Sequence, residues 1–256
     1  MARDLSLSAL ARLQRRGEER FLRNLYCHYV FDDQLKEFEQ IVVRLKQLGT
    51  FVDTPTCVAM AKGERPIDGA YFHLSFDDGF KNNFANAAPI LHRHRVPCMF
   101  FVPSGLIGAD WETTADYCLN TAEYRAVIEM ASWDDLRRAQ DLGFEIGSHT
   151  RTHARFSQIS SDPVRMRDEI AGSKVELEQY LGAPCDYISW PFGKPSDADP
   201  ASLGFVTTAG YRACFGAYRG TVRPGETDIF SIPRHHFEAQ WPISHIQYFA
   251  QGNRES

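Results

Sequence analysis

Residues 71–79, Tyr-Phe-His-Leu-Ser-Phe-Asp-Asp-Gly, join an apolar segment directly to two adjacent carboxylates. Tyr71–Phe76 is rich in aromatic residues and predicts a buried strand. Asp77 and Asp78 would repel each other at the end of that strand unless a cation or a proton lay between them. Gly79 permits a sharp turn that lets both carboxylates face one space. Helix caps and hairpin turns use the same three letters, so the motif needs support from the rest of the chain.

Strands and helices alternate on both sides of this stretch. Helices are expected over residues 35–48, 85–95, 133–142 and 162–181, because apolar side chains recur there at helical spacing and cap or stop residues flank several of them. The other predicted strands are Tyr26–Phe31, Cys98–Val102, Phe144–Ile146, Tyr187–Trp190, Arg212–Phe215 and Phe230–Phe237. Such repeated strand–helix units need crossover connections, which indicates a mainly parallel sheet. A closed or nearly closed barrel fits the strand count, and an open doubly wound sheet is the alternative. In either fold, functional groups lie where the strands end.

Length and composition restrict the class of protein. The chain has 256 residues, 43% of them hydrophobic, which is enough for one domain, assigned here to residues 25–256. A net charge of -5 argues against general nucleic-acid binding. No stretch is long and apolar enough for a transmembrane segment, and no signal peptide is recognised. The six cysteines form no Cys-x-x-Cys pair, so free thiols and a cytoplasmic location are expected.

Residues 1–24 differ from the rest of the chain, because six arginines alternate with leucines there. This pattern predicts an N-terminal amphipathic helical extension. Packing against the barrel is the ordinary role of such a helix. Peripheral contact with an anionic membrane through the basic side chains is the alternative.

A second polar cluster, residues 147–153, follows the predicted strand Phe144–Ile146 and includes His149 and His153. Two histidines four positions apart can meet across a helical turn or a tight loop and chelate one metal. Two histidines with one carboxylate suit a catalytic divalent ion, because they leave positions open for water and substrate. One of the two aspartates would complete the set, and the other would be free to act as a general base. A solvated loop is the ordinary alternative for an isolated histidine pair.

A third cluster, Ser189-Trp190-Pro191-Phe192-Gly193, also follows a predicted strand, and alone it indicates only a turn. Taken in order, the three clusters resemble the motifs of the polysaccharide deacetylase family (the NodB-homology domain, carbohydrate esterase family 4). Residues 75–79 are similar to its T-F-D-D-G motif, residues 149–153 to H-[ST]-x-x-H, and residues 190–193 to the third motif, R-x-P-Y. The resemblance covers roughly residues 26–237.

This resemblance implies a distorted (β/α) barrel of about seven mainly parallel strands, as a single NodB-like domain. It implies that Asp78, His149 and His153 bind one divalent ion, most commonly zinc, and that Asp77 is the base for attack by the metal-bound water. The substrate would be an N-acetylated (or O-acetylated) sugar in a polysaccharide, oligosaccharide or glycolipid. The backbone N–H of Phe192, with Trp190 and Pro191 beside it, would hold the oxyanion.

Two departures from the family pattern concern the base and the acyl pocket. The third motif lacks its arginine, and residues 211–218 give no convincing fourth motif. Arg234, near the end of the last predicted strand, is a candidate to replace that arginine as the partner of Asp77. His236 shares the parity of Arg234 along the strand and is the expected general acid, with His235 packed behind.

Gly105–Met130 has no clear pattern and is expected to form a mobile cover or one wall of the substrate cleft. Three other functions fit parts of the sequence. The same barrel also supports cyclic amide and ureide hydrolysis. A non-haem iron oxygenase would use the same type of ligands, but such enzymes generally have antiparallel double-sheet folds. A catalytically dead carbohydrate-binding module would not need the complete ligand and base set.

Overall fold

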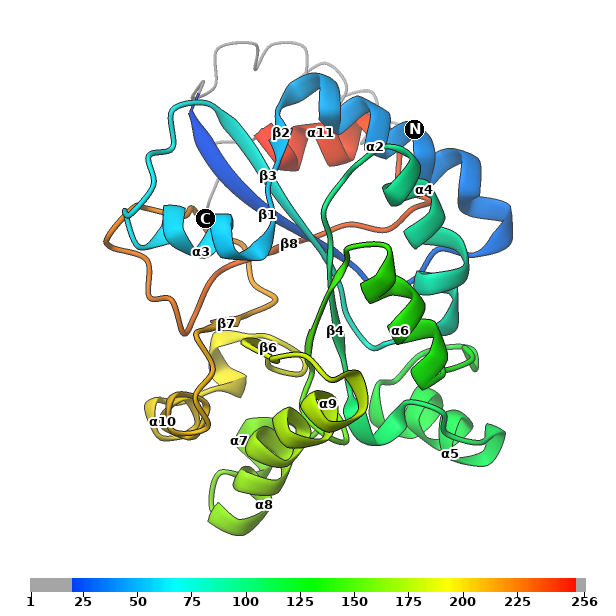
Figure 1. Ribbon diagram of the computed structural model, residues 1–256, viewed down its shortest axis with the longest axis vertical. Helices are drawn as coiled ribbons and strands as arrows, with labels where there is room; N and C mark the ends of the chain where they lie inside the picture. The colour runs from blue at the N-terminus through cyan, green and yellow to red at the C-terminus, as the bar shows by residue number, and fades with distance from the viewer. Residues whose placement is uncertain (1–19, 252–256) are drawn as a thin grey trace.

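A curled parallel sheet forms the centre of the computed structural model, which describes residues 20–251 (Figure 1). Seven strands follow the order β7-β6-β5-β4-β3-β1-β8, and the short strand β2 pairs with β3. All the strand pairings are parallel. The expected α/β fold, a distorted barrel of about seven mainly parallel strands, is therefore confirmed.

The strands lie close to the predicted positions in the middle of the chain and depart from them at its ends. Their bounds are β1 Phe21–Cys27, β2 Thr50–Phe51, β3 Ala70–Phe76, β4 Met99–Val102, β5 Glu145–Ser148, β6 Tyr187–Ser189, β7 Ala213–Phe215 and β8 His235–His236. The prediction of Tyr26–Phe31 for the first strand is wrong in its bounds, since β1 begins at Phe21, inside the predicted extension. Arg23 and Asn24 are both buried in β1, on opposite faces of the strand.

The last predicted strand, Phe230–Phe237, is interrupted. Ile232 forms an isolated bridge with Phe215, and regular pairing with β1 begins only at His235. Pro233 lies between these two pairings and has no N–H to donate to a ladder. Ile232 pairs with β7 and His235 pairs with β1, so this segment connects the two edges of the curled sheet.

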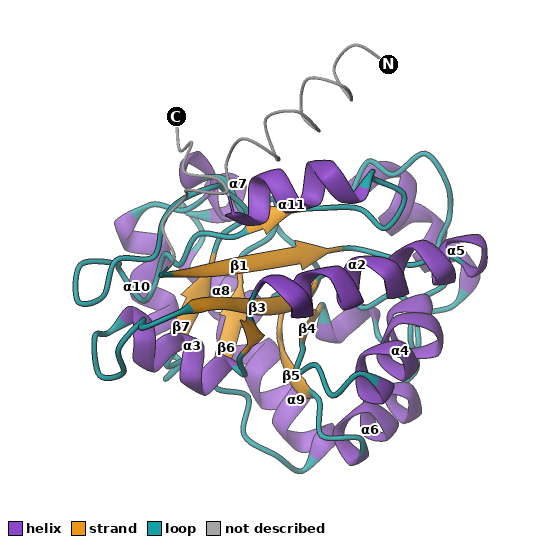
Figure 2. Cartoon of the chain, turned by 90° about the horizontal axis from the view of Figure 1, so that it is seen from above, coloured by secondary structure: helices purple, strands orange, loops and turns teal. Residues whose placement is uncertain are grey.

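Helices surround the sheet, as Figure 2 shows. Their bounds are α2 Leu35–Leu48, α3 Thr54–Ala61, α4 Ala88–Arg93, α5 Trp111–Asp116, α6 Trp133–Asp141, α7 Phe156–Ile159, α8 Pro163–Arg167, α9 Ser173–Leu181, α10 Pro200–Thr208 and α11 Ile243–Gln251. The predicted capping box of α6 is present: the Asp135 N–H donates to Ser132 Oγ, and the Ser132 N–H donates to the Asp135 carboxylate. Gly182 ends α9 with a φ of 63°, as expected of a helix stop.

Alternate residues of β3 face the two sides of the sheet. Phe72, Leu74 and Phe76 belong to the large apolar core that includes the buried side chains of α2 and α4. His73 faces the barrel interior, where its ring stacks on Phe215 at 5.4 Å. Asp77 continues the inward parity of His73, so the strand directs this carboxylate toward the barrel axis.

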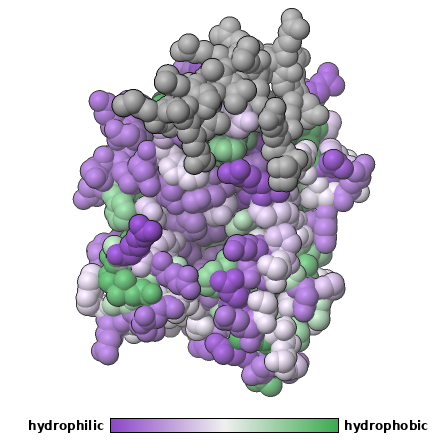
Figure 3. Space-filling view, turned by 180° about the vertical axis from the view of Figure 1, so that it is seen from behind, coloured by the Kyte–Doolittle hydropathy of each residue, from purple (hydrophilic) through white to green (hydrophobic). Residues whose placement is uncertain are grey.

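No helix within residues 20–251 is long and apolar enough to cross a bilayer. The face seen in Figure 3 is mainly hydrophilic, with apolar residues in small groups. All six cysteines are free and buried, as expected. Nineteen residues of the predicted N-terminal extension lie outside the described residues, and with them both its expected packing on the barrel and the alternative of membrane contact.

Candidate active site

The chain turns sharply at the carboxyl end of β3 and buries both aspartates. Asp77 and Asp78 are each 2% exposed. Asp78 and Gly79 both have left-handed backbone conformations, with φ of 72° and 69°. This conformation is unfavourable for aspartate and costs about 1–3 kcal/mol, so the surrounding packing must hold it. The turn separates the two carboxylates, and each has different partners.

Asp78 meets the two histidines that follow β5. Its Oδ1 lies 3.5 Å from His149 Nε2 and 3.3 Å from His153 Nε2. Thr150 and His153 have φ of 65° and 62°, so the loop coils back and brings both rings to the same carboxylate. One ligand atom from each of the three residues lies within 4.8 Å of the other two. The sequence therefore correctly predicted the proximity of these three side chains.

The surroundings of the two imidazoles fit a divalent ion. His149 Nδ1 donates to the Ser189 carbonyl at 2.7 Å, which directs Nε2 toward Asp78. Burial lowers the pKa of His153, which favours the neutral form that binds metals. Burial alone would raise the pKa of Asp78, but hydrogen bonds with the two histidines hold it well below the usual value. Two neutral imidazoles and one carboxylate are a common ligand set for zinc and related ions.

Asp77 has a different partner, Arg234. The guanidinium donates from Nη1 to Oδ1 and from Nη2 to Oδ2, both at 2.7 Å. Two serines fix the same group, because Arg234 also donates to Ser75 Oγ at 2.9 Å and to Ser189 Oγ at 2.5 Å. Burial would raise the pKa of Asp77, but the charge of Arg234 outweighs that effect and lowers it. The expected replacement of the missing third-motif arginine by Arg234 is thus present in the structure.

Both carboxylates border a cavity of about 180 Å³ at the mouth of the barrel. The residues that line it are Tyr26, His28, Asp77, Asp78, Ala122, Tyr124, His149, His153, Trp190, Phe192 and Ala217. The Tyr124 hydroxyl donates to Asp78 Oδ2. The cavity therefore combines the candidate metal ligands and the candidate base with an imidazole and two tyrosines.

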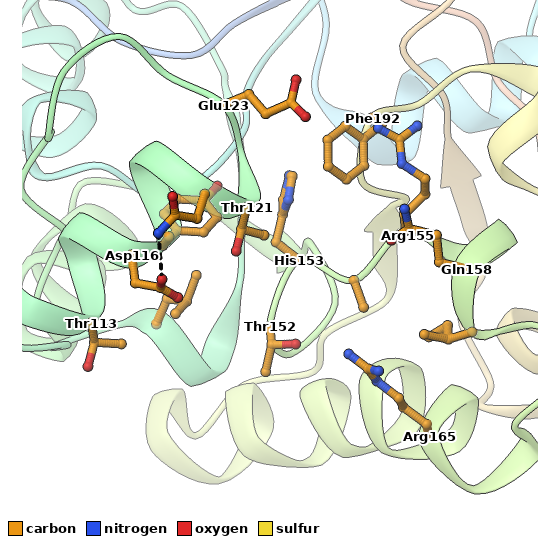
Figure 4. Close-up of a pocket in the computed structure, with 15 residues that line it drawn as sticks. Thr113, Asp116, Thr121, Glu123, Thr152, His153, Arg155, Gln158, Arg165 and Phe192 are labelled. Atoms are coloured by element: carbon orange, nitrogen blue, oxygen red, sulfur yellow. Dashed lines mark hydrogen bonds between the residues drawn. The ribbon is translucent and has the colours of Figure 1, made fainter.

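A larger groove of about 460 Å³ adjoins this cavity, and His153 and Phe192 line both spaces (Figure 4). One wall comes from residues 106–123, within the segment predicted to cover or flank the cleft, and contributes Asp116 and Glu123. The opposite wall contains Arg155, whose guanidinium lies 3.6 Å from the ring centroid of Phe192. Part of Gly105–Met130 therefore forms a wall of this groove, and the hydroxyl, amide and charged groups of the groove suit a polar ligand.

The third predicted motif supplies part of the cavity. Trp190 and Phe192 line it, whereas Pro191 does not. Phe192 has a φ of 62° and Gly193 a φ of 65°. A Cβ added to Gly193 would lie 2.1 Å from Ala217 Cβ, so only glycine allows this close approach of the two loops.

The two candidate acid histidines in β8 lie in different environments. His235 Nε2 is 2.8 Å from an Arg23 nitrogen and 3.3 Å from the Gly220 carbonyl oxygen, away from the cavity lining. His236 Nε2 donates to Glu238 Oε1 at 2.6 Å. Glu238 is 7% exposed, and its Oε1 also lies 3.4 Å from His28 Nδ1. His28 lines the cavity, and His236 is not among the lining residues.

Sequence reasoning gave no site role to His28 or Glu238 and did not place Tyr124 on Asp78. His28 follows β1 directly, and a position just after a strand end is the signal that could have identified it. The predicted strand Tyr26–Phe31 hid this signal, because it placed His28 inside the strand. Tyr124 lies within Gly105–Met130, for which the sequence indicated a cover or wall but no individual contact. Glu238 lies beyond the last predicted strand and gave no signal.

The comparisons with known proteins agree with this geometry. The family model described as polysaccharide deacetylase matches residues 65–214. A Bacillus subtilis protein, YxkH, described as a "Putative polysaccharide deacetylase", is 22% identical over 203 residues. The match covers 74% of this chain and 65% of that protein, so the chain spans less than two thirds of its length. The structure of IcaB from Ammonifex degensii is similar with a TM-score of 0.74 and 24% identity, over 91% of this chain and 98% of that one. The Streptococcus pyogenes deacetylase PplD, in complex with acetate, is similar with a TM-score of 0.70 and 16% identity, over 92% and 100% of the two chains.

Proposed function

Because the chain belongs to the polysaccharide deacetylase family, we propose that it is a metal-dependent hydrolase that removes an acetyl group from an N-acetylated (or O-acetylated) sugar of a glycan or glycolipid. One arrangement carries the proposal: Asp77, held by Arg234, and the Asp78–His149–His153 group border the same cavity. An ionised base next to a site for a divalent cation is what hydrolysis of an acyl group requires.

Asp78, His149 and His153 would hold the ion, most commonly zinc in this family. The ion would lower the pKa of a water and polarise the acyl oxygen. His149 is oriented for this role by the Ser189 carbonyl, and Tyr124 orients Asp78 through its other oxygen. These contacts fix the ligands before any ion binds, which reduces the cost of ordering them.

Asp77 would accept the proton of the attacking water. Arg234 keeps the carboxylate ionised and fixes its plane, because both oxygens are hydrogen-bonded to one rigid guanidinium. The backbone N–H of Phe192 is proposed to stabilise the oxyanion, since Phe192 lies in the cavity wall next to His153.

The leaving amine needs a proton, since an amide anion is too basic to leave unassisted. We assign this role to His28, because it lines the cavity and its Nδ1 faces the buried Glu238 carboxylate. The sequence favoured His236 as the acid. In the structure His236 contacts the same carboxylate and lies 4.9 Å from the ring centroid of His28, so it would support His28 and not protonate the amine itself.

The adjoining groove supports a glycan as substrate. Its volume of about 460 Å³ is within the range of small-molecule sites, and its lining of hydroxyl, amide and charged groups matches a ligand rich in hydroxyls. The reacting sugar would sit at the cavity, with neighbouring units along the groove past Phe192. A reducing compartment such as the cytoplasm is part of the proposal, on the ground that all six cysteines are free and buried.

A substrate panel tests this function. Zinc-loaded protein would be incubated with N-acetylated mono- and oligosaccharides, O-acetyl esters and cyclic imides, with acetate release and ring opening measured separately. Release of acetate from N-acetylated sugars, increasing with chain length, is the expected result. Ring opening without acetate release would instead establish the cyclic amide alternative.

A further inference from the structure

A second group of metal-ligand side chains lies beside the candidate active site. It consists of His28, His236 and Glu238, whose ligand atoms lie within 4.8 Å of one another. Glu238 Oε1 is shared between the two rings, at 2.6 Å from His236 Nε2 and 3.4 Å from His28 Nδ1. None of these residues belongs to the Asp78 group.

We propose that His28, His236 and Glu238 form a second site for a divalent cation, one that inhibits the enzyme when it is filled. Two imidazoles and one carboxylate are the same ligand types as in the first site, and three protein ligands with an open position are sufficient for zinc. In the absence of the ion, two N–H groups share a single carboxylate oxygen. One ion would replace both protons while keeping all three ligand atoms.

The surroundings hold the three ligands in place. The Cys27 thiol lies 3.9 Å from Glu238 Oε2, on the oxygen that the imidazoles do not use. The ring centroid of His236 lies 5.1 Å from that of Tyr26 and 5.3 Å from that of Trp241. Glu238 is buried, whereas the side chains of His28 and His236 are 23% and 31% exposed, so an ion can enter from the solvent side.

Inhibition follows from the chemistry of His28, and this step rests on the proposed function. An imidazole that binds a cation through Nδ1 cannot also carry a proton there, so it cannot become an imidazolium. Its remaining N–H is a far weaker acid, and protonation of the leaving amine fails. The second site therefore makes zinc both a requirement and, in excess, an inhibitor.

Metal counting by equilibrium dialysis against zinc chloride tests the site without any substrate. Wild type is expected to bind two ions per chain, the His236→Gln and Glu238→Gln variants one, and His149→Ala one. The double variant His149→Ala/His236→Gln is expected to bind none. His92→Gln, which alters an exposed histidine of α4, is the matched control and should bind two. Circular dichroism would verify that each variant is folded.

A wild type that binds a single ion would overturn the proposal, as would a second ion that persists in both His236→Gln and Glu238→Gln. Where a substrate has been identified, each variant's rate in excess zinc would be divided by its own rate at one equivalent. This ratio should be about 0.1 or lower in wild type and His92→Gln, and close to one in His236→Gln. Equal inhibition in all three would overturn the inhibitory role. Failure of every substrate would refute the proposed function alone, since the metal count is independent of turnover.

Discussion

Arg234 donates one hydrogen bond to each carboxylate oxygen of Asp77, both at 2.7 Å, although the two residues lie 157 positions apart. The pair joins the end of β3 to the segment that closes the barrel between β7 and β1. The side chains are 0% and 4% exposed, so neither charge is compensated by solvent. The barrel closure and the candidate base therefore depend on the same ion pair.

Arg234→Gln is expected to lower the free energy of unfolding by about 3–5 kcal/mol, because it leaves Asp77 buried without its cation. Urea denaturation measures the loss. Arg212→Gln is the control: it breaks the exposed pair with Asp186 and should cost about 1 kcal/mol or less. Equal small losses in both variants would show that the buried pair does not stabilise the fold.

His149→Ala is expected to abolish turnover while the fold stays intact. The variant removes one of three candidate ligands, whose ring contacts the Ser189 carbonyl, Asp78 and His153. Metal content at the Asp78 site should fall by at least tenfold, measured at limiting zinc. Normal metal content together with near-normal activity would show that His149 is not a ligand.

Asp77→Asn and Asp78→Asn are expected to behave differently. Asn at position 77 cannot accept the proton of water, so the ion should stay bound while the rate falls by about 10²–10⁴-fold. Asn at position 78 should lose the ion. Paired measurements of metal content and rate on the two variants would reveal a reversed assignment if Asp77→Asn lost metal and Asp78→Asn kept it.

The central strands and the candidate metal ligands could be predicted because their signals are local. β3 and β4 are mainly apolar segments, β5 follows the apolar residue Phe144, and Asp78, His149 and His153 each lie within a few residues of a strand end. Because the carboxyl ends of parallel strands meet at one edge of the sheet, the three residues were expected in the same region, and the left-handed turns at Asp78, Thr150 and His153 complete their approach.

The rest depends on contacts between distant segments. The predicted first strand was displaced from β1 because the hydrogen-bond partners of Arg23 and Asn24 lie in residues 220–235. No local sequence pattern reveals such distant partners. His28 received no role for the same reason. The predicted strand Tyr26–Phe31 placed it inside a strand, whereas β1 ends at Cys27, directly before it. Glu238 gains its role only because the chain returns to β1 after the last strand. The bridge at Ile232 and the break at Pro233 likewise follow from barrel closure.

Stability should fall as the pH is lowered below about 6.5, through His73. Burial lowers the pKa of this histidine to about 3, so it remains neutral in the folded state. The unfolded chain binds the extra proton between pH 6.5 and 3, which favours unfolding by up to about 1.4 kcal/mol per pH unit. Burial also lowers the pKa of His235 to about 3, with the same sign.

His73→Gln should therefore show a smaller loss of unfolding free energy than wild type between pH 6.5 and 5, by about 2 kcal/mol. The two proteins are compared by the slope of unfolding free energy against pH, because the substitution itself lowers stability at every pH. His92→Gln, on the surface of α4, should keep the wild-type slope. An unchanged slope in His73→Gln would mean that the buried ring takes up its proton in the folded state.

The final prediction separates the three histidines that could protonate the leaving amine. Only His28 lines the cavity; His236 shares the Glu238 carboxylate with it, and His235 is held by Arg23 and the Gly220 carbonyl. A general acid matters for a poor leaving group and little for a good one. His28→Gln should therefore lower the rate on an N-acetyl sugar by about 10²–10⁴-fold, yet lower the rate on 4-nitrophenyl acetate by less than about tenfold. His236→Gln should lower the N-acetyl rate to a smaller extent, since it removes a neighbour of the acid, and His235→Gln should change the two rates in parallel. If His236→Gln showed the selective loss and His28→Gln did not, the acid would be His236, as the strand parity of the sequence first indicated.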